Sequence, residues 1–310
     1  MPLRPRRLEP GARIGVVSPS YWIEPERLQR AVKVFEEQGY ELVLGRSTGL
    51  KQNKYAGTPE DRAEDILAMF ADASIDALVC ARGVYGGNRV LPLLDYEFIR
   101  SNPKIFMGFS DVTGFLASMA QQSGLVTFHG PMLTTYGRET EPYNLETFHR
   151  VLSGEGSVKV GAPPGCPARV LRPGQARGVL LGGNLSLIEE RLGTAGQLDT
   201  RGAILFLEEI DERLHSFDRM MLHLKEAGTL EHIRGLVLGE MLEICDTTEP
   251  FGKDTDEIAL DVCDGLDIPI ISNFPCGHGR FQATLPVFHE VEIHAQGDDG
   301  HILIPEPPVL

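Results

Sequence analysis

The chain has 310 residues, of which 42% are hydrophobic and 24% are charged, and its formal net charge is -15. This length fits two packed α/β units, and the composition is that of an ordinary globular enzyme. The acidic balance, with no basic run to offset it, argues against a nucleic-acid surface, and no apolar run approaches the roughly 20 residues that a membrane helix needs.

The start of the chain and its cysteines both predict a cytoplasmic protein. The arginines between residues 4 and 7 are followed by Leu-Glu-Pro and not by an apolar segment, so no secretory signal peptide is expected. The five cysteines are scattered without a C-x-x-C pair, as in proteins with reduced thiols. Cys276 stands two places before His278, so a thiol nucleophile is an alternative to a small buried residue.

The first half of the chain alternates predicted strands with predicted helices. Apolar runs predict strands, and apolar residues at helical spacing predict the helices between them. In chain order, the strands are expected at 13–17, 40–44, 77–80, 105–107 and 124–131, and the helices at 26–38, from 58 onward and from 111 to 123. This alternation predicts a parallel sheet covered on both faces, with ligands bound beyond the carboxyl ends of its strands.

The sequence Gly-Phe-Ser-Asp at 108–111 joins the strand at 105–107 to the following helix. Ser110 is therefore expected in a tight turn between strand and helix, like the nucleophile in the G-x-S-x-G elbow of hydrolases. Such a turn raises the side-chain oxygen above the sheet and directs the first helical amides at the atom that it attacks. The alternative is that Ser110 only caps the helix.

A second loop, ARGVYGGN at 81–88, follows the strand at 77–80. Because neighbouring parallel strands end at the same edge of a sheet, this loop and Ser110 are expected to adjoin. Its three glycines allow close approach of the backbone, and exposed amides could hold an oxyanion. The loop lacks the G-x-G-x-x-G fingerprint and the chain has no G-x-x-x-x-G-K-[ST] motif, so we expect no bound nucleotide.

The amino-acid composition of the chain changes between residues 140 and 175. Four prolines between 162 and 174 predict a linker with little regular structure. We therefore expect a first domain over 1–150, a linker over 151–175 and a second domain over 176–310. The second domain is expected to contain strands at 176–181, 203–207, 235–239 and 268–273, a turn at 182–184, helices at 185–188, 217–226 and 256–264, and a hairpin of 290–296 and 301–305 around a turn at 297–300.

Candidates for a base and an acid lie in the second half. A serine nucleophile needs a base within hydrogen-bond reach and a third group that orients the base. His278 stands between two glycines after a predicted strand, where a loop can aim an imidazole, although a structural loop histidine is the alternative. Glu208 and Glu209 end the strand at 203–207, and strand alternation lets only one of them face a cleft.

Other histidines are weaker candidates. His129 follows an apolar strand and could line the site, though a structural role is expected. His289 and His294 lie in HEVEIH, which is not H-E-x-x-H, so we predict no metal site there.

These segments together resemble the LD-carboxypeptidases, a family of serine peptidases that includes murein tetrapeptide carboxypeptidases and the microcin C self-immunity protein. The resemblance covers nearly the whole chain. It is carried by RIGVVSPS, ARGVYGGNRVLPLLD, GFSD, HGPM, GGNLSLI, LFLEEIDE and GHGRFQATLPV, in that order. It implies an N-terminal Rossmann-like parallel-sheet domain, a C-terminal β/α domain, a site between them and a homodimer.

By position, the resemblance implies Ser110 as nucleophile, Glu208 as acid and His278 as base. Main-chain amides near Gly83 and Val84, together with Asp111, would form the oxyanion hole. The chain departs from the family pattern twice. The family loop is commonly R-G-G-Y-G, and here Val84 replaces the second glycine; the acid is usually followed by aspartate, and here by glutamate.

The implied reaction is hydrolysis of the amide between an L-configured centre, such as that of meso-diaminopimelate, and a terminal D-amino acid. No cofactor is expected, and the expected substrate is a small murein tetrapeptide that loses D-alanine during cell-wall recycling. RGVYGG is more similar to the murein-recycling branch than to the microcin branch, whose loop resembles I-G-G-D. A hydrolase of peptidyl adenylates and a non-catalytic two-domain binding protein are the alternatives. Residues that could grip the terminal carboxylate are Arg82, Arg219 and Arg280.

Overall fold

The computed structural model describes residues 2–138, 140–297 and 299–310. The chain forms two compact units. Unit 1 comprises residues 1–155, 283–288 and 307–310, and unit 2 comprises residues 156–282 and 289–306. Both units are therefore built from segments that are not contiguous in the sequence.

Unit 1 is organised around a six-stranded sheet with the order β12-β5-β4-β3-β1-β2. Neighbouring strands from β5 to β2 are parallel, and β12 is antiparallel to β5. The central strands are almost wholly buried, as expected where helices cover a parallel sheet, so the predicted parallel sheet is confirmed. The strands are β1 (Arg13–Val17), β2 (Glu41–Leu44), β3 (Ala77–Cys80), β4 (Ile105–Gly108), β5 (Thr127–His129) and β12 (Leu285–Val287).

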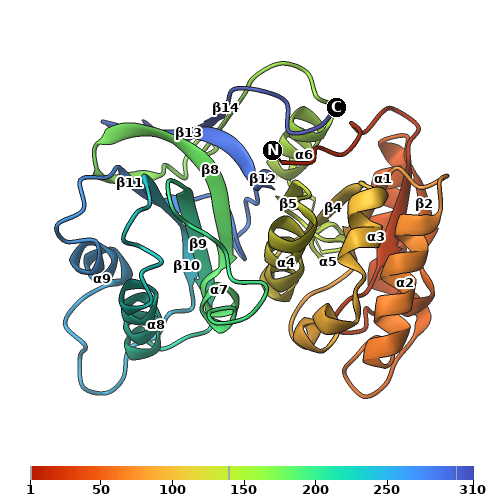
Figure 1. Ribbon diagram of the computed structural model, residues 1–310, viewed down its shortest axis with the longest axis horizontal. Helices are drawn as coiled ribbons and strands as arrows, with labels where there is room; N and C mark the ends of the chain where they lie inside the picture. The colour runs from red at the N-terminus through yellow and green to blue at the C-terminus, as the bar shows by residue number, and fades with distance from the viewer. Residues whose placement is uncertain (1, 139, 298) are drawn as a thin grey trace. The chain divides into compact units, whose positions relative to one another are not determined.

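The helices of unit 1 begin and end at residues with clear local causes. Thr58 at the N-cap and Asp61 at N3 form a capping box, and Pro59 occupies N1, which together fix the start of α2. Helix α4, which lies beside α3 in Figure 1, ends at Gly124 in the left-handed conformation with φ 73°. The helices are α1 (Pro25–Glu37), α2 (Pro59–Ala71), α3 (Tyr96–Ser101), α4 (Thr113–Ser123), α5 (Leu133–Tyr136) and α6 (Pro142–Leu152).

Unit 2 has an eight-stranded mixed sheet with the order β6-β14-β13-β8-β9-β10-β11-β7. Strands β8 to β11 are parallel, and the strands at both sides pair antiparallel. Helices α8 and α9 lie side by side in Figure 1. The elements are β6 (Val158–Gly161), β7 (Arg169–Arg172), β8 (Gly174–Asn184), α7 (Leu185–Glu190), β9 (Ile204–Ile210), α8 (Leu214–Glu226), β10 (Gly235–Leu242), α9 (Thr255–Val262), β11 (Ile270–Phe274), β13 (His289–Gln296) and β14 (Asp299–Ile304).

The proline-rich stretch between 151 and 175 differs from the prediction of little regular structure. It contains β6 and β7, which form the two edges of the eight-stranded sheet. Proline cannot donate to a strand ladder, but the four prolines lie between the two strands or directly after the second one. The prolines therefore bound these edge strands and do not prevent them.

The glycines at 182 and 183 also differ from the prediction, which placed a turn there. They belong to the end of β8, which continues to Asn184. A Cβ on Gly182 would lie 1.8 Å from the carbonyl oxygen of Phe206, so glycine is what allows β8 to approach β9. Strands β13 and β14 form the predicted hairpin, and Asp298 in its predicted turn lies outside the described residues.

Candidate active site

Ser110 lies where β4 ends and the chain turns into a helix. Its φ is 62°, in the left-handed region that residues other than glycine seldom adopt. A 3₁₀ turn over Ser110–Val112 follows and leads directly into α4. A Cβ on Gly108 would lie 2.7 Å from a methyl group of Val112, so this turn can close only around a glycine. The predicted strand–turn–helix geometry is therefore present.

The alternative role of Ser110 as a helix cap does not fit this turn. Phe109 occupies the N-cap of the 3₁₀ turn and Val112 that of α4, and in this described stretch neither cap makes a side-chain hydrogen bond. Non-glycine residues held at positive φ cluster at active sites, because the rest of the fold must stabilise them. The backbone thus presents the Ser110 hydroxyl without using it to begin a helix.

The glycine loop at 81–88 adjoins Ser110, as expected from the pairing of β3 with β4. A Cβ on Gly83 would lie 3.2 Å from the Cβ of Ser110. Val84 has φ 86° and is 52% exposed. The amide of Tyr21 donates to the Gly83 carbonyl oxygen at 3.3 Å. Because the peptide is planar and trans, the Val84 N–H points away from Tyr21.

The side chain of Asp111 ties the elbow to two other loops, a role that sequence reasoning missed. Its Oδ2 accepts the backbone N–H of Gly87 at 2.8 Å and the hydroxyl of Ser20. Asp111 is only 3% exposed, and a buried carboxylate needs such donors. The sequence signal for it was an acidic residue directly after the predicted nucleophile, in a turn between two buried elements.

In unit 2, Nδ1 of His278 lies 2.7 Å from Oε2 of Glu208. Glu208 comes from β9 and its side chain is fully buried, whereas that of His278 is 16% exposed. A carboxylate can only accept here, so Nδ1 carries the proton and Nε2 of the neutral ring holds the lone pair. This is the arrangement of an acid that orients a general base. Ser110 belongs to unit 1, and its action with this pair stays a prediction.

The glycines on either side of His278 allow two carboxylates to approach its loop. A Cβ on Gly277 would lie 2.6 Å from Oε2 of Glu208. A Cβ on Gly279 would lie 1.5 Å from Oε2 of Glu240. The residues beside His278 must therefore be glycines for these side chains to fit.

Glu209 faces the other side of β9, as the alternation of the strand predicts. Its carboxylate accepts from Nδ2 of Asn184 at 2.9 Å and from the amide of Ser186 at 2.8 Å. Burial raises the pKa of Glu209, and these hydrogen bonds oppose that shift. Glu209 thus stabilises the start of α7, which leaves Glu208 as the carboxylate that contacts His278.

Glu240 in β10 is a third carboxylate near this loop, half-buried, that sequence reasoning did not identify. Burial, followed by the negative charge of Glu208, raises its pKa to about 7. Its Oε2 has no hydrogen-bond partner among the described residues. The sequence carried no signal for it, because only the fold brings β10 under the His278 loop.

The cysteine alternative is not supported by the surroundings of Cys276. Its side chain is fully buried, and burial, followed by the charges of Glu208 and Glu240, raises the pKa of its thiol well above the usual value. A reactive thiol needs a lowered pKa and access to substrate. His129 is 1% exposed at the end of β5, in keeping with the expected structural role.

The three arginines considered for carboxylate binding occupy different surroundings. Arg82 donates through Nη1 to the Trp22 carbonyl oxygen and to Oε1 of Glu24, both at 3.1 Å. Arg219 lies on α8, and Arg280 lies 5.2 Å from the ring centroid of Phe281. Arg82 is thus engaged within unit 1, in the glycine loop itself.

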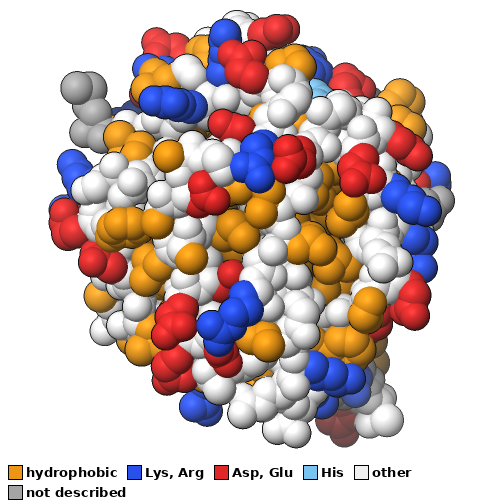
Figure 2. All heavy atoms as spheres, turned by 90° about the vertical axis from the view of Figure 1, so that its right-hand side faces the viewer, with side chains coloured by type: hydrophobic (Ala, Val, Ile, Leu, Met, Phe, Trp, Pro, Cys, Tyr) orange, Lys and Arg blue, Asp and Glu red, His pale blue; other side chains and the backbone are white. Residues whose placement is uncertain are grey.

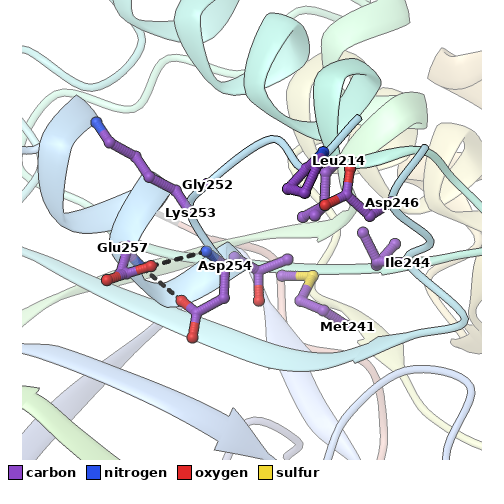
Figure 3. Close-up of a pocket in the computed structure, with 10 residues that line it drawn as sticks. Leu214, Met241, Ile244, Asp246, Gly252, Lys253, Asp254 and Glu257 are labelled. Atoms are coloured by element: carbon purple, nitrogen blue, oxygen red, sulfur yellow. Dashed lines mark hydrogen bonds between the residues drawn. The ribbon is translucent and has the colours of Figure 1, made fainter. Parts of the chain in front are cut away.

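An open hollow of about 430 Å³ in unit 2, drawn in Figure 3, contains none of the predicted site residues in its lining. Asp254 and Glu257 exchange backbone–carboxylate hydrogen bonds of 2.9 Å, marked by dashes, as the capping box that begins α9. Lys253 forms an ion pair with Asp261. These charged groups are used locally, so we assign the hollow no catalytic role.

The surface drawn in Figure 2 carries acidic and basic side chains interspersed with apolar ones. This mixture agrees with the net charge of -15 and gives no continuous basic area on that face. In the described part of the chain, none of the helices has the length and apolar character needed to cross a membrane.

Comparison with known proteins gives matches to both units. Residues 14–130 match the LD-carboxypeptidase N-terminal domain, and residues 177–293 match the LD-carboxypeptidase C-terminal domain. A Bacillus subtilis protein named "Probable murein peptide carboxypeptidase" is 33% identical over 285 residues, which cover 92% of this chain and 89% of that protein.

Solved structures give matches of similar extent. The muramoyltetrapeptide carboxypeptidase from Oxalobacter formigenes has a TM-score of 0.85 at 28% identity, covering 96% of this chain and all of that one. The wild-type apo structure of MccF, the microcin C7 self-immunity protein known from Escherichia coli, has a TM-score of 0.91 at 27% identity, with both chains fully covered. The two-domain α/β fold is therefore shared with both.

Proposed function

The chain belongs to the LD-carboxypeptidase family and is a serine-type carboxypeptidase, and we propose that it releases the terminal D-alanine of murein tetrapeptides in cell-wall recycling. The observation that carries the proposal is Ser110 held at φ 62° against the glycine loop. The names of the Bacillus subtilis and Oxalobacter formigenes relatives support murein peptides as the substrate class. The expected cytoplasmic location follows from that substrate.

In the proposed mechanism, Ser110 Oγ attacks the carbonyl carbon of the L,D-amide while Nε2 of His278 takes the hydroxyl proton. The C–N bond then breaks, and His278 returns the proton to the leaving amine of D-alanine. A water molecule attacks the acyl-enzyme with His278 again as base, which releases the shortened peptide and restores Ser110. Glu208 holds the ring tautomer and stabilises the imidazolium that forms.

The negative oxygen of the tetrahedral intermediate needs donors that are already in place. We assign this role to the amides near Gly83 and Val84 and to Asp111. The Val84 N–H points away from Tyr21, and Asp111 is the second residue of the 3₁₀ turn, where backbone amides are not used within the helix. Donors fixed in this way require no rearrangement when the charge develops.

A second candidate is hydrolysis of peptidyl adenylates. It is favoured by the TM-score of 0.91 with MccF, a relative also solved in complex with aspartyl sulfamoyl adenosine. Both substrates would use the same nucleophile, so the two candidates are distinguished by the substrate that is cleaved.

The direct test is mass spectrometry of L-Ala-γ-D-Glu-meso-DAP-D-Ala after incubation with the protein, with Ser110→Ala as the matched control. The expected result is loss of one D-alanine with the wild type only. An intact tetrapeptide with folded protein would move the assignment to peptidyl adenylates, tested in the same way. If these also remain intact, a non-catalytic binding protein is the better description.

The homodimer that the family resemblance implies is part of this proposal. Sedimentation analysis of the purified chain over a range of concentrations measures it directly. We expect twice the mass of 34.1 kDa. A single species at 34.1 kDa at all concentrations would remove this part of the proposal.

A further inference from the structure

Arg62 on α2 is a buried cation that the proposed mechanism does not use. Its side chain is 1% exposed. Nη1 donates to the carbonyl oxygens of Pro19 at 2.8 Å and Gly86 at 3.0 Å, and Nε donates to that of Thr58 at 3.2 Å. An isolated charge in a protein interior is costly, so these contacts and a nearby anion must compensate for its burial.

The nearby anion is Asp111, the residue after the proposed nucleophile. Burial lowers the pKa of Arg62, and the charge of Asp111 is the main opposing influence. Arginine keeps its proton under these conditions because its usual pKa is above 12. The interior beside the elbow thus contains one positive and one negative group.

Two loops, one containing Pro19 and Ser20 and the other containing Gly86 and Gly87, each form hydrogen bonds to both Arg62 and Asp111. Gly86 presents its carbonyl oxygen to Arg62, and the N–H of the same peptide, on Gly87, points to Asp111. Pro19 likewise presents its carbonyl oxygen to Arg62, while the hydroxyl of the next residue, Ser20, donates to Asp111. Each loop therefore has its acceptor toward the cation and its donor toward the anion, the favourable orientation for both.

The same contacts determine the position of the Val84 amide, which is proposed for the oxyanion hole. The residue after Ser20 is Tyr21, whose amide holds the Gly83 carbonyl oxygen at 3.3 Å. That contact sets the direction of the Val84 N–H, which lies in the same planar peptide. The loop is therefore held on one side through Tyr21 and on the other through the Gly86–Gly87 peptide.

We propose that Arg62 is a positioning residue of the oxyanion hole, which acts with Asp111 to clamp the 19–21 and 83–87 loops beside Ser110. Arg62 contacts no reacting atom in this assignment and works through the backbone of these loops. The role rests on the proposed use of the Val84 amide in a serine peptidase mechanism.

The first test measures kcat and KM for Arg62→Lys on the murein tetrapeptide. Lysine keeps the charge but has one nitrogen, so it cannot reproduce the planar guanidinium, whose Nη1 bonds Pro19 and Gly86 while its Nε bonds Thr58. We expect kcat to fall about 10- to 100-fold with KM within about two-fold, because a misplaced donor weakens transition-state binding above all. Ser20→Ala, which removes one bond to Asp111 without changing any charge, is expected to lower kcat in the same way by a smaller factor.

Lys104 provides a matched control. It is also a buried cation of unit 1 and donates to the carbonyl oxygens of Met69, at 3.0 Å, and Asp72. It precedes β4, whereas Ser110 follows that strand. Lys104→Met is therefore expected to lower the melting temperature while kcat of the folded protein stays within about two-fold of wild type.

A second measurement needs no substrate and separates this inference from the proposed function. Amide hydrogen exchange at residues 83–87 is expected to be faster in Arg62→Lys than in the wild type and unchanged in Lys104→Met. Unchanged exchange at these amides in Arg62→Lys would overturn the clamp. So would an unchanged kcat in both Arg62→Lys and Ser20→Ala, or an equal loss of kcat in Lys104→Met. If the wild type does not cleave the peptide, the proposed substrate is wrong and the exchange result alone decides the role of Arg62.

Discussion

Ser110 and Val84 are two non-glycine residues at positive φ in loops that touch, with φ values of 62° and 86°. For an L-residue the left-handed region costs roughly 1–2 kcal/mol, more where the side chain is β-branched. Such a cost persists only where surrounding contacts impose the conformation. Here those contacts are the packing of Gly108 on Val112 and the bond from the Gly87 N–H to Asp111, which joins the two loops. Strain is thus concentrated at the proposed site of attack.

Replacing the proposed nucleophile is expected to remove activity and leave the fold intact. Ser110→Ala should lower kcat on the tetrapeptide on the order of 10³-fold or more, because the attacking oxygen is lost. The serine side chain makes no capping bond in the described turn, so the melting temperature should stay within a few degrees of wild type. Circular dichroism and steady-state kinetics check both parts. Unchanged turnover in the folded variant would exclude Ser110 as the nucleophile.

Val84→Gly tests whether the valine side chain or only its amide matters. The change relieves left-handed strain of roughly 1–2 kcal/mol but adds about 0.5–1 kcal/mol of backbone entropy to the unfolded chain. We therefore expect the free energy of unfolding to be unchanged or to rise by about 1 kcal/mol, with kcat within about three-fold of wild type. Denaturant unfolding and kinetics measure these. A ten-fold loss of kcat at unchanged stability would show that the exposed valine side chain itself takes part.

At the scale of elements, hydrophobic periodicity was enough to predict the order of strands and helices. Strands β1 and β3 begin and end where the apolar runs predict, because a parallel strand that is buried on both faces reads as a continuous apolar run. Periodicity failed where pairing depends on a distant segment. The edge strands β6 and β7 have weak patterns, and their partners β14 and β11 lie about a hundred residues or more further along the chain.

The same limit applies to the candidate site. Ser110 and His278 follow strands β4 and β11, and Glu208 lies in the second half of β9, where local pattern and family resemblance predict them as site residues. Arg62 and Glu240 carry no motif, because their importance comes only from what the fold places against them. Residues such as these can be identified only once a structure is known.

Glu240 predicts a pH dependence of stability. Its pKa in the folded chain is about 7, above the usual 4.5, because burial and Glu208 disfavour its charge. Its contribution to the free energy of unfolding is therefore fully present below pH 4.5 and is lost as the pH rises through 7. Glu240→Gln, which keeps the shape without the titration, should gain in melting temperature relative to wild type by a few degrees between pH 5 and 8.

The control for this prediction is Glu226→Gln, an exposed position at the end of α8. Its melting temperature should follow the wild type at every pH. Thermal unfolding in a series of buffers gives both comparisons. A constant difference between Glu240→Gln and wild type from pH 4 to 9 would contradict the raised pKa.

At the scale of the whole molecule, the chain leaves unit 1 after residue 155 and returns to it twice. Residues 283–288 supply β12, which pairs with β5, and residues 307–310 return after the β13–β14 hairpin. Local sequence patterns could not reveal this, because a strand of three residues does not specify its sheet. The proposed catalytic residues come from both units.

The segment 307–310, with which the chain returns to unit 1, is expected to stabilise that unit measurably. Val309 is 2% exposed, and the Leu310 carbonyl oxygen accepts the amide of Arg7 at 2.8 Å. Val309→Ala removes buried methyl groups, which should lower the free energy of unfolding by about 1–2 kcal/mol. Leu310→Ala is the matched control, because that side chain is 64% exposed and should change stability by less than about 0.5 kcal/mol. Equal losses in the two variants, measured by denaturant unfolding, would show that this segment does not pack on unit 1 as described.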